Sequence, residues 1–566
     1  MYKKIKDKMK ITNERIIKIS KEFDKTPKIV EIIFYIIYIV LFLVLSHYHE
    51  PWNDEVQSFM IAKDATYKEM IFRLGHGEAH PALWWIMLSI FAKNGVNMMI
   101  SLKLTSLIVN CISVYVILFK LRTVKIFKII IPFTYFFFYQ YGVISRCYCL
   151  LILGFSLLAL FWNKKEEKPL KTVLSMLLIC LSSAYGIALM LGMGIVWVID
   201  ILKDCKNNSY KSVFKKRVKE IKALILLSAI AFMISILLIP NKNTYALKSA
   251  EINATKIGKI IYNLVYMIFI EPIDALFFSS VYSDTRLSRY EITITVFVIG
   301  IVLSLIFWSV ILHIPETYGR RREFIIPQTV FVLASTFTFF VSHHLGITTV
   351  FFFFWIYVCF EENNLKTKNE CRKKYKETKV GKYMLEGEGK VLLPFEWMIF
   401  AMIIIVSLNW SINSLILDFS KAYVPDIAFI EKINSYAERE YKVYTTNQPT
   451  LAAYKTDNII MYNDLLNGRK IDFTLLDPTE YEIDEKVKYW SEIGFPDVVT
   501  DFQYGIVESI SMELGEKAPE YRMIEYVDAG KIFKGVQENG GYIIFMREDL
   551  ADELGGLGLN KVNLKK

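Results

Sequence analysis

The chain has 566 residues, of which 54% are hydrophobic and 15% aromatic, and its formal net charge is +10. A soluble protein of this length would carry fewer apolar residues, so the composition excludes an ordinary soluble enzyme and indicates a polytopic α-helical membrane protein. The seven cysteines lie in or beside apolar runs or in basic loops, which excludes a disulfide framework and a zinc motif. The excess positive charge lies in short loops, so it indicates membrane topology and gives no reason to expect nucleic-acid binding.

The chain begins with a basic segment and one apolar run. Residues 1–28 contain ten Lys and Arg against four acids, and we expect this segment in the cytoplasm. No small-residue cleavage site follows the first apolar run, which argues against a cleavable signal peptide. A span over about 29–46 should lead outward into a long first outer loop, 47–102. In this loop Asn53 is expected to cap a helix, and the short apolar run 81–91, with its double Trp, is typical of an interfacial helix.

Apolar runs of 15 to 23 residues recur up to residue 413, each long enough or nearly long enough to cross about 30 Å of hydrocarbon. A second outer loop is expected over 241–290. The further spans are expected at about 103–120, 126–142 and 147–162, in a two-span hairpin around 182–186, and at about 223–240, 291–313, 324–342, 347–360 and 394–413. This gives about eleven spans within a transmembrane module over 29–413. Every strongly basic loop then falls on one side, which predicts a multi-pass plasma-membrane protein with a cytoplasmic N-terminus and an extracytoplasmic C-terminal domain.

Residues 420–566 differ in character, with 17 Lys and Arg, 26 Asp and Glu, and no long apolar run. Short segments at 441–444, 458–462 and 541–546 predict strands, and the patterns at 426–437 and 485–494 predict helices. The alternation of strands and helices predicts a small α/β domain. This domain has no Gly-rich phosphate loop and no obvious catalytic triad, so we interpret it as an accessory domain.

Asp54 and Glu55 are two adjacent carboxylates directly after the first span. Acids at the edge of the hydrocarbon layer are costly to desolvate, which makes the pair a candidate site. One carboxylate could act as general base on an acceptor hydroxyl while the other holds a sugar hydroxyl or a metal. Alternatively, both could simply begin a helix and face water, where acids suit the helix dipole.

A second candidate segment contains His76, Glu78 and His80, just before the double Trp. Spacings of two and four residues would allow Glu78 and the histidines to bind a divalent ion, or His80 to contact a phosphate. A solvated polar loop is the alternative interpretation, and it is favoured for His76.

Cationic side chains are expected at the outer ends of later spans. Arg146 could hold a lipid phosphate with its planar guanidinium, or it could extend to the headgroups. Arg286 and Arg289 have the same two interpretations, and the second is favoured for them. His343 and His344 form an uncommon pair at the outer mouth between two spans, where they could contact a ligand or a phosphate.

Three segments resemble a known pattern in order and rough spacing: Pro51-Trp52-Asn53-Asp54-Glu55, Glu78-Ala79-His80-Pro81-Ala82-Leu83-Trp84-Trp85 and Ser145-Arg146-Cys147-Tyr148-Cys149-Leu150. The chain resembles the multispanning GT-C glycosyltransferases, in the branch of the protein O-mannosyltransferases and aminoarabinose lipid A transferases. That family has an outer-loop carboxylate motif, a Glu-x-His/Lys-Pro-Pro-Leu segment and an Arg-x-Tyr-x-Leu motif. Ala82 replaces the second Pro of the middle motif. The resemblance covers about residues 30–165.

The resemblance implies a GT-C-like enzyme that moves a sugar from a polyprenyl-phosphate carrier to a lipid, glycan or protein acceptor outside the cytoplasm. Asp54 would be the catalytic carboxylate and Glu55 would hold the acceptor or a metal. Glu78 and His80 would line the donor phosphate or bind a divalent cation such as Mg²⁺ or Mn²⁺, which not all such enzymes need. Arg146, followed by Tyr148 of the same motif, would help to neutralise the phosphate.

Two other classes remain as alternatives. A transporter or flippase of lipid-linked glycans would show internal repeats and broken helices near the midplane, and the sequence shows no convincing repeat. A polysaccharide polymerase or ligase would share the lipid-linked substrates, but its essential residues would lie in the later outer loop 241–290.

Overall fold

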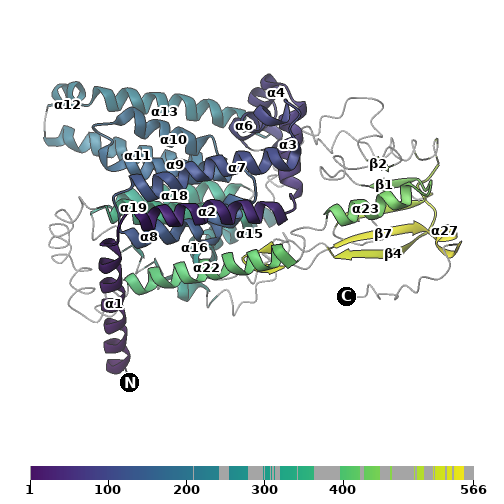
Figure 1. Ribbon diagram of the computed structural model, residues 1–566. Helices are drawn as coiled ribbons and strands as arrows, with labels where there is room; N and C mark the ends of the chain where they lie inside the picture. Colours follow the sequence, from purple (N-terminus) through teal and green to yellow (C-terminus); the bar gives the residue numbers. More distant parts are fainter. Residues whose placement is uncertain are drawn as a thin grey trace.

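The computed structural model describes residues 2–240, 254–277, 298–312, 319–361, 396–420, 426–445, 459–461, 490–502, 514–528, 532–537 and 541–553, apart from residues 79, 208, 299, 306, 309–310, 339, 341, 491, 493 and 515–516 (Figure 1). Parts of the expected span 291–313, of the second outer loop and of the expected helix 485–494 lie outside these residues. The described residues form a helix bundle and a small sheet near the C-terminus.

The bundle contains most of the helices. Its first half consists of α1 (Tyr2–Asp24), α2 (Ile29–Tyr48), α3 (Asn53–Asp64), α4 (Tyr67–Phe72), α5 (Gly75–Glu78), α6 (Leu83–Ala92), α7 (Met98–Tyr115), η1 (Val116–Lys120), α8 (Lys125–Ile130), η2 (Ile131–Phe133), η3 (Phe136–Val143), α9 (Tyr148–Phe161) and η4 (Trp162–Lys164). Its second half consists of α10 (Pro169–Cys180), α11 (Ala184–Asn207), α12 (Tyr210–Lys216), α13 (Val218–Leu237), α15 (Ala254–Val265), η5 (Tyr266–Ile270), α16 (Glu271–Leu276), α18 (Arg321–Phe337), η6 (Ser342–His344), α19 (Leu345–Cys359) and α22 (Glu396–Ser420).

The helices confirm a polytopic membrane protein. Among the described residues, six helices are long and apolar enough to cross a membrane, and a seventh span results if the helices Lys125–Phe133 and Phe136–Val143, which meet at 41°, count as one. The expected count of eleven stays a prediction, because helices such as α9 and α10 are apolar but short. The expected interfacial segment forms α6, whose two Trp side chains are buried.

The centre and the periphery of the bundle differ in composition. Every residue of α19, including its four consecutive Phe, is buried, and most of α9 is buried as well. By contrast, only 28% of the apolar window of α2, and the same share of α13, is buried within the protein. A helix that stays apolar on its exposed side requires lipid and not water around it, so α2 and α13 belong to the lipid-facing layer.

The C-terminal sheet has five strands in the order β2-β1-β3-β7-β4, in which β1 is parallel to β2 and β3, and β7 is antiparallel to β3 and β4. The helix α23 (Asp426–Ala437) packs on this sheet, where Phe429 stacks on Tyr542 with ring centroids 3.9 Å apart. The strands and the last helix are β1 (Val443–Thr445), β2 (Ile459–Met461), β3 (Val498–Phe502), β4 (Tyr521–Asp528), β7 (Gly541–Arg547) and α27 (Glu548–Glu553).

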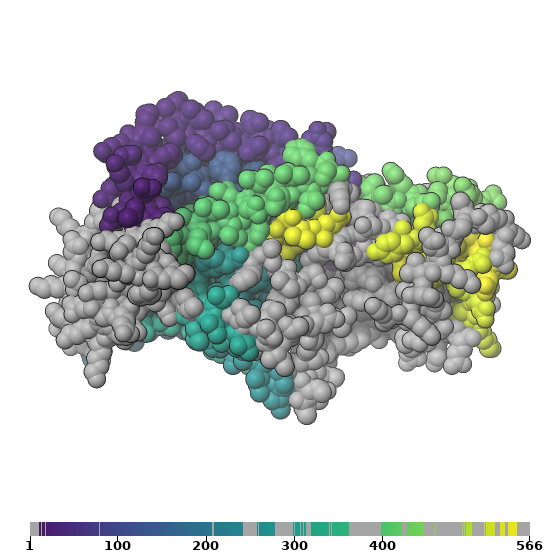
Figure 2. Space-filling model, turned by 90° about the horizontal axis from the view of Figure 1, so that it is seen from below, coloured from purple at the N-terminus to yellow at the C-terminus, as the bar shows by residue number. Residues whose placement is uncertain are grey.

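A separate hairpin of β5 (Ile532–Phe533) and β6 (Val536–Gln537) leaves this sheet and packs against α22 of the bundle, as the yellow patch beside the green helix in Figure 2 shows. Its turn residues Lys534 and Gly535 have φ of 48° and 75°, which suits the two-residue turn of a tight hairpin. A Cβ at Gly535 would lie 2.5 Å from Cβ of Asn413, so only glycine fits there. The hairpin therefore couples the C-terminal region to the bundle.

Candidate functional site

The first turn of α3 positions the two candidate carboxylates. Trp52, in an extended conformation, is the residue before the helix, and its backbone N–H donates to Oε2 of Glu55 at 2.9 Å. The expectation that Asn53 caps this helix is wrong by one residue, since Asn53 already belongs to the helix. Asp54 and Glu55 point to different surroundings because neighbouring helical residues are about 100° apart.

Glu55 faces the protein interior and is completely buried. Its Oε1 accepts a hydrogen bond from the Ser145 backbone at 2.6 Å, and its Oε2 lies 3.2 Å from Nε2 of His49. Burial alone would raise the pKa of Glu55, but the charges of Lys103 and His49, with the bonds from His49 and the Trp52 amide, lower it to about 2. Glu55 is therefore a fixed anion that joins α3 to the segment before α9.

His49 extends this network to the last helix of the bundle. Its Nδ1 lies 2.8 Å from Oδ2 of Asp418 on α22, and the Tyr139 hydroxyl donates to the same oxygen at 2.9 Å. Burial and Lys103 disfavour the charged imidazolium, but Asp418 and Glu55 outweigh them and raise the pKa of His49. The buried His49 ring thus bridges two buried carboxylates that are 363 residues apart in the chain.

Asp54 lies on the open side of the cluster and forms an ion pair with Arg146. The Asp54 side chain is 34% exposed while that of Arg146 is 9% exposed, so a ligand can reach this pair from the Asp54 side. The guanidinium also lies over the rings of Trp52 and Tyr148, at 5.3 and 5.7 Å from their centroids. Burial disfavours its charge, but Asp54 more than compensates and raises the pKa of Arg146.

His80 lies beside the Asp54–Arg146 ion pair. Its Nε2 lies 3.3 Å from a terminal nitrogen of Arg146, and its Nδ1 lies 3.7 Å from Sγ of Cys147. A guanidinium can only donate, so Nε2 of His80 accepts this bond and the imidazole is neutral. Burial, with the adjacent charge of Arg146, lowers the pKa of His80 to about 3, which agrees with a neutral ring.

Aromatic and imidazole rings form the wall beside Arg146. The ring of His343 lies 5.8 Å from Trp52 and 5.9 Å from Tyr148, and the ring of His344 lies 6.0 Å from Tyr148. The Tyr141 hydroxyl donates to the His343 carbonyl at 2.7 Å, which fixes the start of α19. Both candidate histidines thus belong to the same cluster as Arg146.

A close approach of two helices supports this wall. Tyr141, from η3, stacks on Tyr148 with ring centroids 4.7 Å apart. A Cβ at Gly346 would lie 2.5 Å from Cζ of Tyr141, so glycine at this position gives the tyrosine its space. Gly346 therefore makes room for the stack of Tyr141 on Tyr148 because it has no side chain.

The other predicted site residues either lie away from this cluster or have side chains outside the described part of the structure. Nδ1 of His76 lies 2.7 Å from the Ile239 carbonyl after α13, so His76 joins two segments of the bundle. Glu78 ends α5, but its side chain lies outside the described residues, as do Arg286 and Arg289. In the described part of the chain, no group of three or more His, Cys, Asp and Glu side chains is arranged to hold a metal ion.

Three residues near Glu55 were not predicted from the sequence. They are His49, Asp418 and Lys103, whose Nζ is buried and has no hydrogen-bond partner among the described residues. Asp418 and Lys103 carry a detectable signal, because each is an ionisable residue within an otherwise apolar helix. The sequence does not reveal that they meet.

Comparisons with known proteins do not identify a family. Neither the protein-family models, nor the curated proteins, nor the solved structures give a match to this chain. The resemblance to GT-C glycosyltransferases therefore stays a prediction from motifs, and the chemistry of the cluster carries the functional inference.

Proposed function

We propose that this protein is a membrane glycosyltransferase that transfers a sugar from a polyprenyl-phosphate carrier to an acceptor hydroxyl. The observation that supports the proposal is the convergence of Asp54, His80 and Arg146, which come from three separate sequence motifs. An accessible carboxylate beside a largely buried guanidinium offers a base for a hydroxyl and a cation for a phosphate in one place.

The ion pair suggests how the donor would engage. Asp54 neutralises Arg146 in the structure. A carrier phosphate would replace Asp54 as the partner of Arg146, because a guanidinium binds phosphate through two parallel hydrogen bonds. Asp54 would then be free to accept a proton, so donor binding itself would prepare the base.

The transfer step needs no further reactant. The acceptor oxygen forms a bond to the anomeric carbon while its proton passes to Asp54. The bond between the anomeric carbon and the phosphate oxygen breaks, and its electron pair leaves with the polyprenyl phosphate. Arg146 stabilises the charge that develops on this leaving group. Glu55, with His49 beside it, holds the Ser145 amide against the start of α3, and so positions the backbone from which the Asp54 and Arg146 side chains extend.

We also propose an orientation and a span count. Figure 1 shows α3 and α6 at the end of the bundle nearest to the sheet, and α12 at the opposite end. The basic segment 203–222 belongs to the α12 end, which we assign to the cytoplasm by the positive-inside rule. Eleven spans in a plasma membrane, with the Asp54 cluster and the α/β domain outside, agree with this assignment.

The test is sugar transfer by purified protein in nanodiscs with a radiolabelled polyprenyl-phosphate sugar. We expect Asp54→Asn to lower the turnover rate by at least about 100-fold, the usual contribution of a positioned base. Asp64→Asn is the matched control, since Asp64 is an exposed acid at the other end of α3. Equal turnover in the two variants would contradict the proposal, and label that crosses the membrane of sealed proteoliposomes without transfer would indicate a flippase instead.

A further inference from the structure

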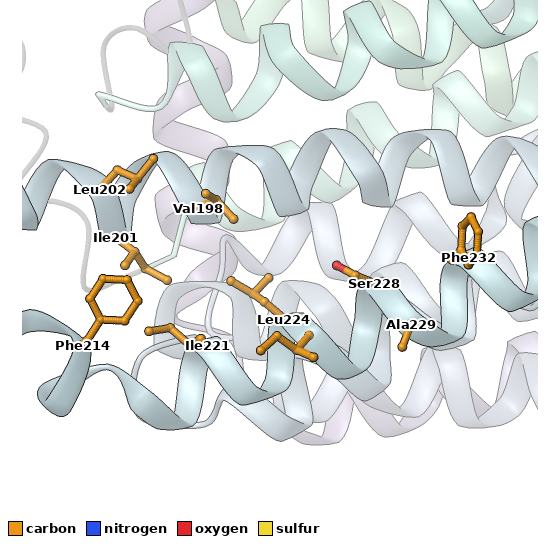
Figure 3. Close-up of a pocket in the computed structure, with 10 residues that line it drawn as sticks. Val198, Ile201, Leu202, Phe214, Ile221, Leu224, Ser228, Ala229 and Phe232 are labelled. Atoms are coloured by element: carbon orange, nitrogen blue, oxygen red, sulfur yellow. The ribbon is translucent and has the colours of Figure 1, made fainter.

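An apolar groove runs between α11 and α13, on the lipid-facing side of the bundle. Its volume is about 710 Å³, within the range of about 300 to 1,000 Å³ that small-molecule sites show. In Figure 3, Val198 and Leu202 on α11 and Phe232 on α13 lie along its two walls, and Phe214 of α12 lies at one end. Apart from Ser228, the side chains that line it are apolar.

The groove is open to the surroundings of the bundle. Ile225 and Phe232 are 64% and 66% exposed, although both belong to a helix long and apolar enough to cross a membrane. Lipid must cover these side chains, and the groove would receive a chain of that lipid.

A basic hollow lies on the other side of the same helix, at its first two turns. Four exposed lysines line it, and Glu167 is the one acid in its lining; the lysines are Lys168, Lys171, Lys219 and Lys222. None of the four ammonium groups has a carboxylate partner among the described residues. The hollow therefore has a net positive charge that the described protein does not neutralise.

Three acids near these lysines form ion pairs with Arg217 instead. Arg217, directly before α13, pairs with Glu166 at 3.0 Å, Asp204 at 2.5 Å and Glu220 at 3.1 Å. Through Arg217, Glu166 and Asp204 hold the loop before α10 and the C-terminal part of α11 against the start of α13. Because these acids pair with Arg217, they do not neutralise the four lysines, which can therefore bind an external anion.

We propose that the groove and the basic hollow together bind an anionic diacyl phospholipid. Its phosphate would lie among the four lysines, and an acyl chain would follow α13 along the groove. Lys222 of the basic hollow and Ile225 of the groove are three residues apart on α13, which makes them neighbours on the surface of the helix. A helix of a second copy would cover the apolar groove equally well, but it would leave the lysines without counter-charge, so the charge favours a lipid.

The basic hollow lies near α12, at the end of the bundle opposite to α3 (Figure 1), so the proposed phosphate site is separate from the proposed transfer site. The test is native mass spectrometry of the full-length protein, released from nanodiscs that contain equal amounts of phosphatidylglycerol and phosphatidylcholine. We expect retained phosphatidylglycerol to exceed phosphatidylcholine, and the triple variant K171A/K219A/K222A to lose about 100-fold of it, since each lysine near an anionic lipid strengthens binding by about fivefold.

Two further variants separate this site from general surface charge. K211A/K215A/K216A removes three exposed lysines of α12 that line neither hollow, and it should retain wild-type binding. Ala229→Trp fills the groove without changing the charge, and it should lower phosphatidylglycerol retention while the protein stays folded. Equal losses in both lysine triples, unchanged binding in Ala229→Trp, a dimer in place of bound lipid, or preferential retention of added polyprenyl phosphate would each overturn the proposal.

Discussion

The attachment of the β5–β6 hairpin to the bundle gives a quantitative prediction. Nζ of Lys534 lies 2.8 Å from Oδ1 of Asp274 and 2.5 Å from its carbonyl oxygen, and 4.6 Å from the ring centroid of Trp410. The Lys534 and Asp274 side chains are 1% and 5% exposed, and Glu271 nearby is completely buried. Lys534→Met would leave two buried carboxyl groups without their cation.

Removal of one partner from a buried ion pair costs about 3 to 5 kcal/mol, and the lost cation–π contact adds about 0.5 to 2 kcal/mol. The double variant K534M/D274N should recover part of this loss, because it removes the unpaired carboxylate as well. Denaturation with SDS, followed by tryptophan fluorescence, measures these changes in the free energy of unfolding. Lys517→Met is the control, since Lys517 is an exposed lysine in the same C-terminal region.

A change below about 1 kcal/mol in Lys534→Met, similar to that of the control, would refute the reasoning, because an exposed ion pair contributes no more than that. The same conclusion would follow if the losses of the two single variants simply added in the double variant. Additive losses would show that Lys534 and Asp274 do not interact.

Two other predictions concern pH. Burial, with the nearby charge of Asp274, raises the pKa of Glu271 to about 8, so its contribution to stability is full below about pH 4.5 and is lost as pH rises through 8. Glu271→Gln should therefore unfold at a higher temperature than wild type at pH 9 and near the wild-type temperature at pH 5; parallel melting profiles would contradict this. The raised pKa of His49 makes its contribution full below about pH 6.5 and lost as pH rises further. His49→Leu should lower the unfolding temperature most at acidic pH, and a loss independent of pH would show that the imidazolium does not hold the two carboxylates.

The sequence predicts the bundle better than the cluster because hydropathy is a local property. The first expected span, 29–46, matches α2 within two residues, since an apolar run followed by polar residues sets both ends. The helix 426–437 coincides with α23. The number of spans is harder to predict from hydropathy. A helix such as α9 is apolar because it is buried among other helices, and it is too short to cross the membrane by itself.

Within the cluster, the sequence motifs indicate residue types but not their directions. The adjacency of Asp54 and Glu55 leaves open which acid faces solvent, and the packing of the Ser145 backbone onto Glu55 decides it. The His49–Asp418 contact joins distant parts of the chain, and no local pattern specifies it. The same holds for Lys534, a charged residue in a hairpin turn that nevertheless lies buried against the bundle.

The measurement that tests the central proposal most directly is a cryo-electron microscopy structure of the protein in nanodiscs with a polyprenyl-phosphate sugar. We predict that the donor phosphate lies at Arg146, between the Trp52 and Tyr148 rings, and that Asp54 has separated from Arg146 and faces the anomeric carbon. Donor density elsewhere, with the Asp54–Arg146 ion pair still intact, would contradict the assignment of this cluster as the transfer site.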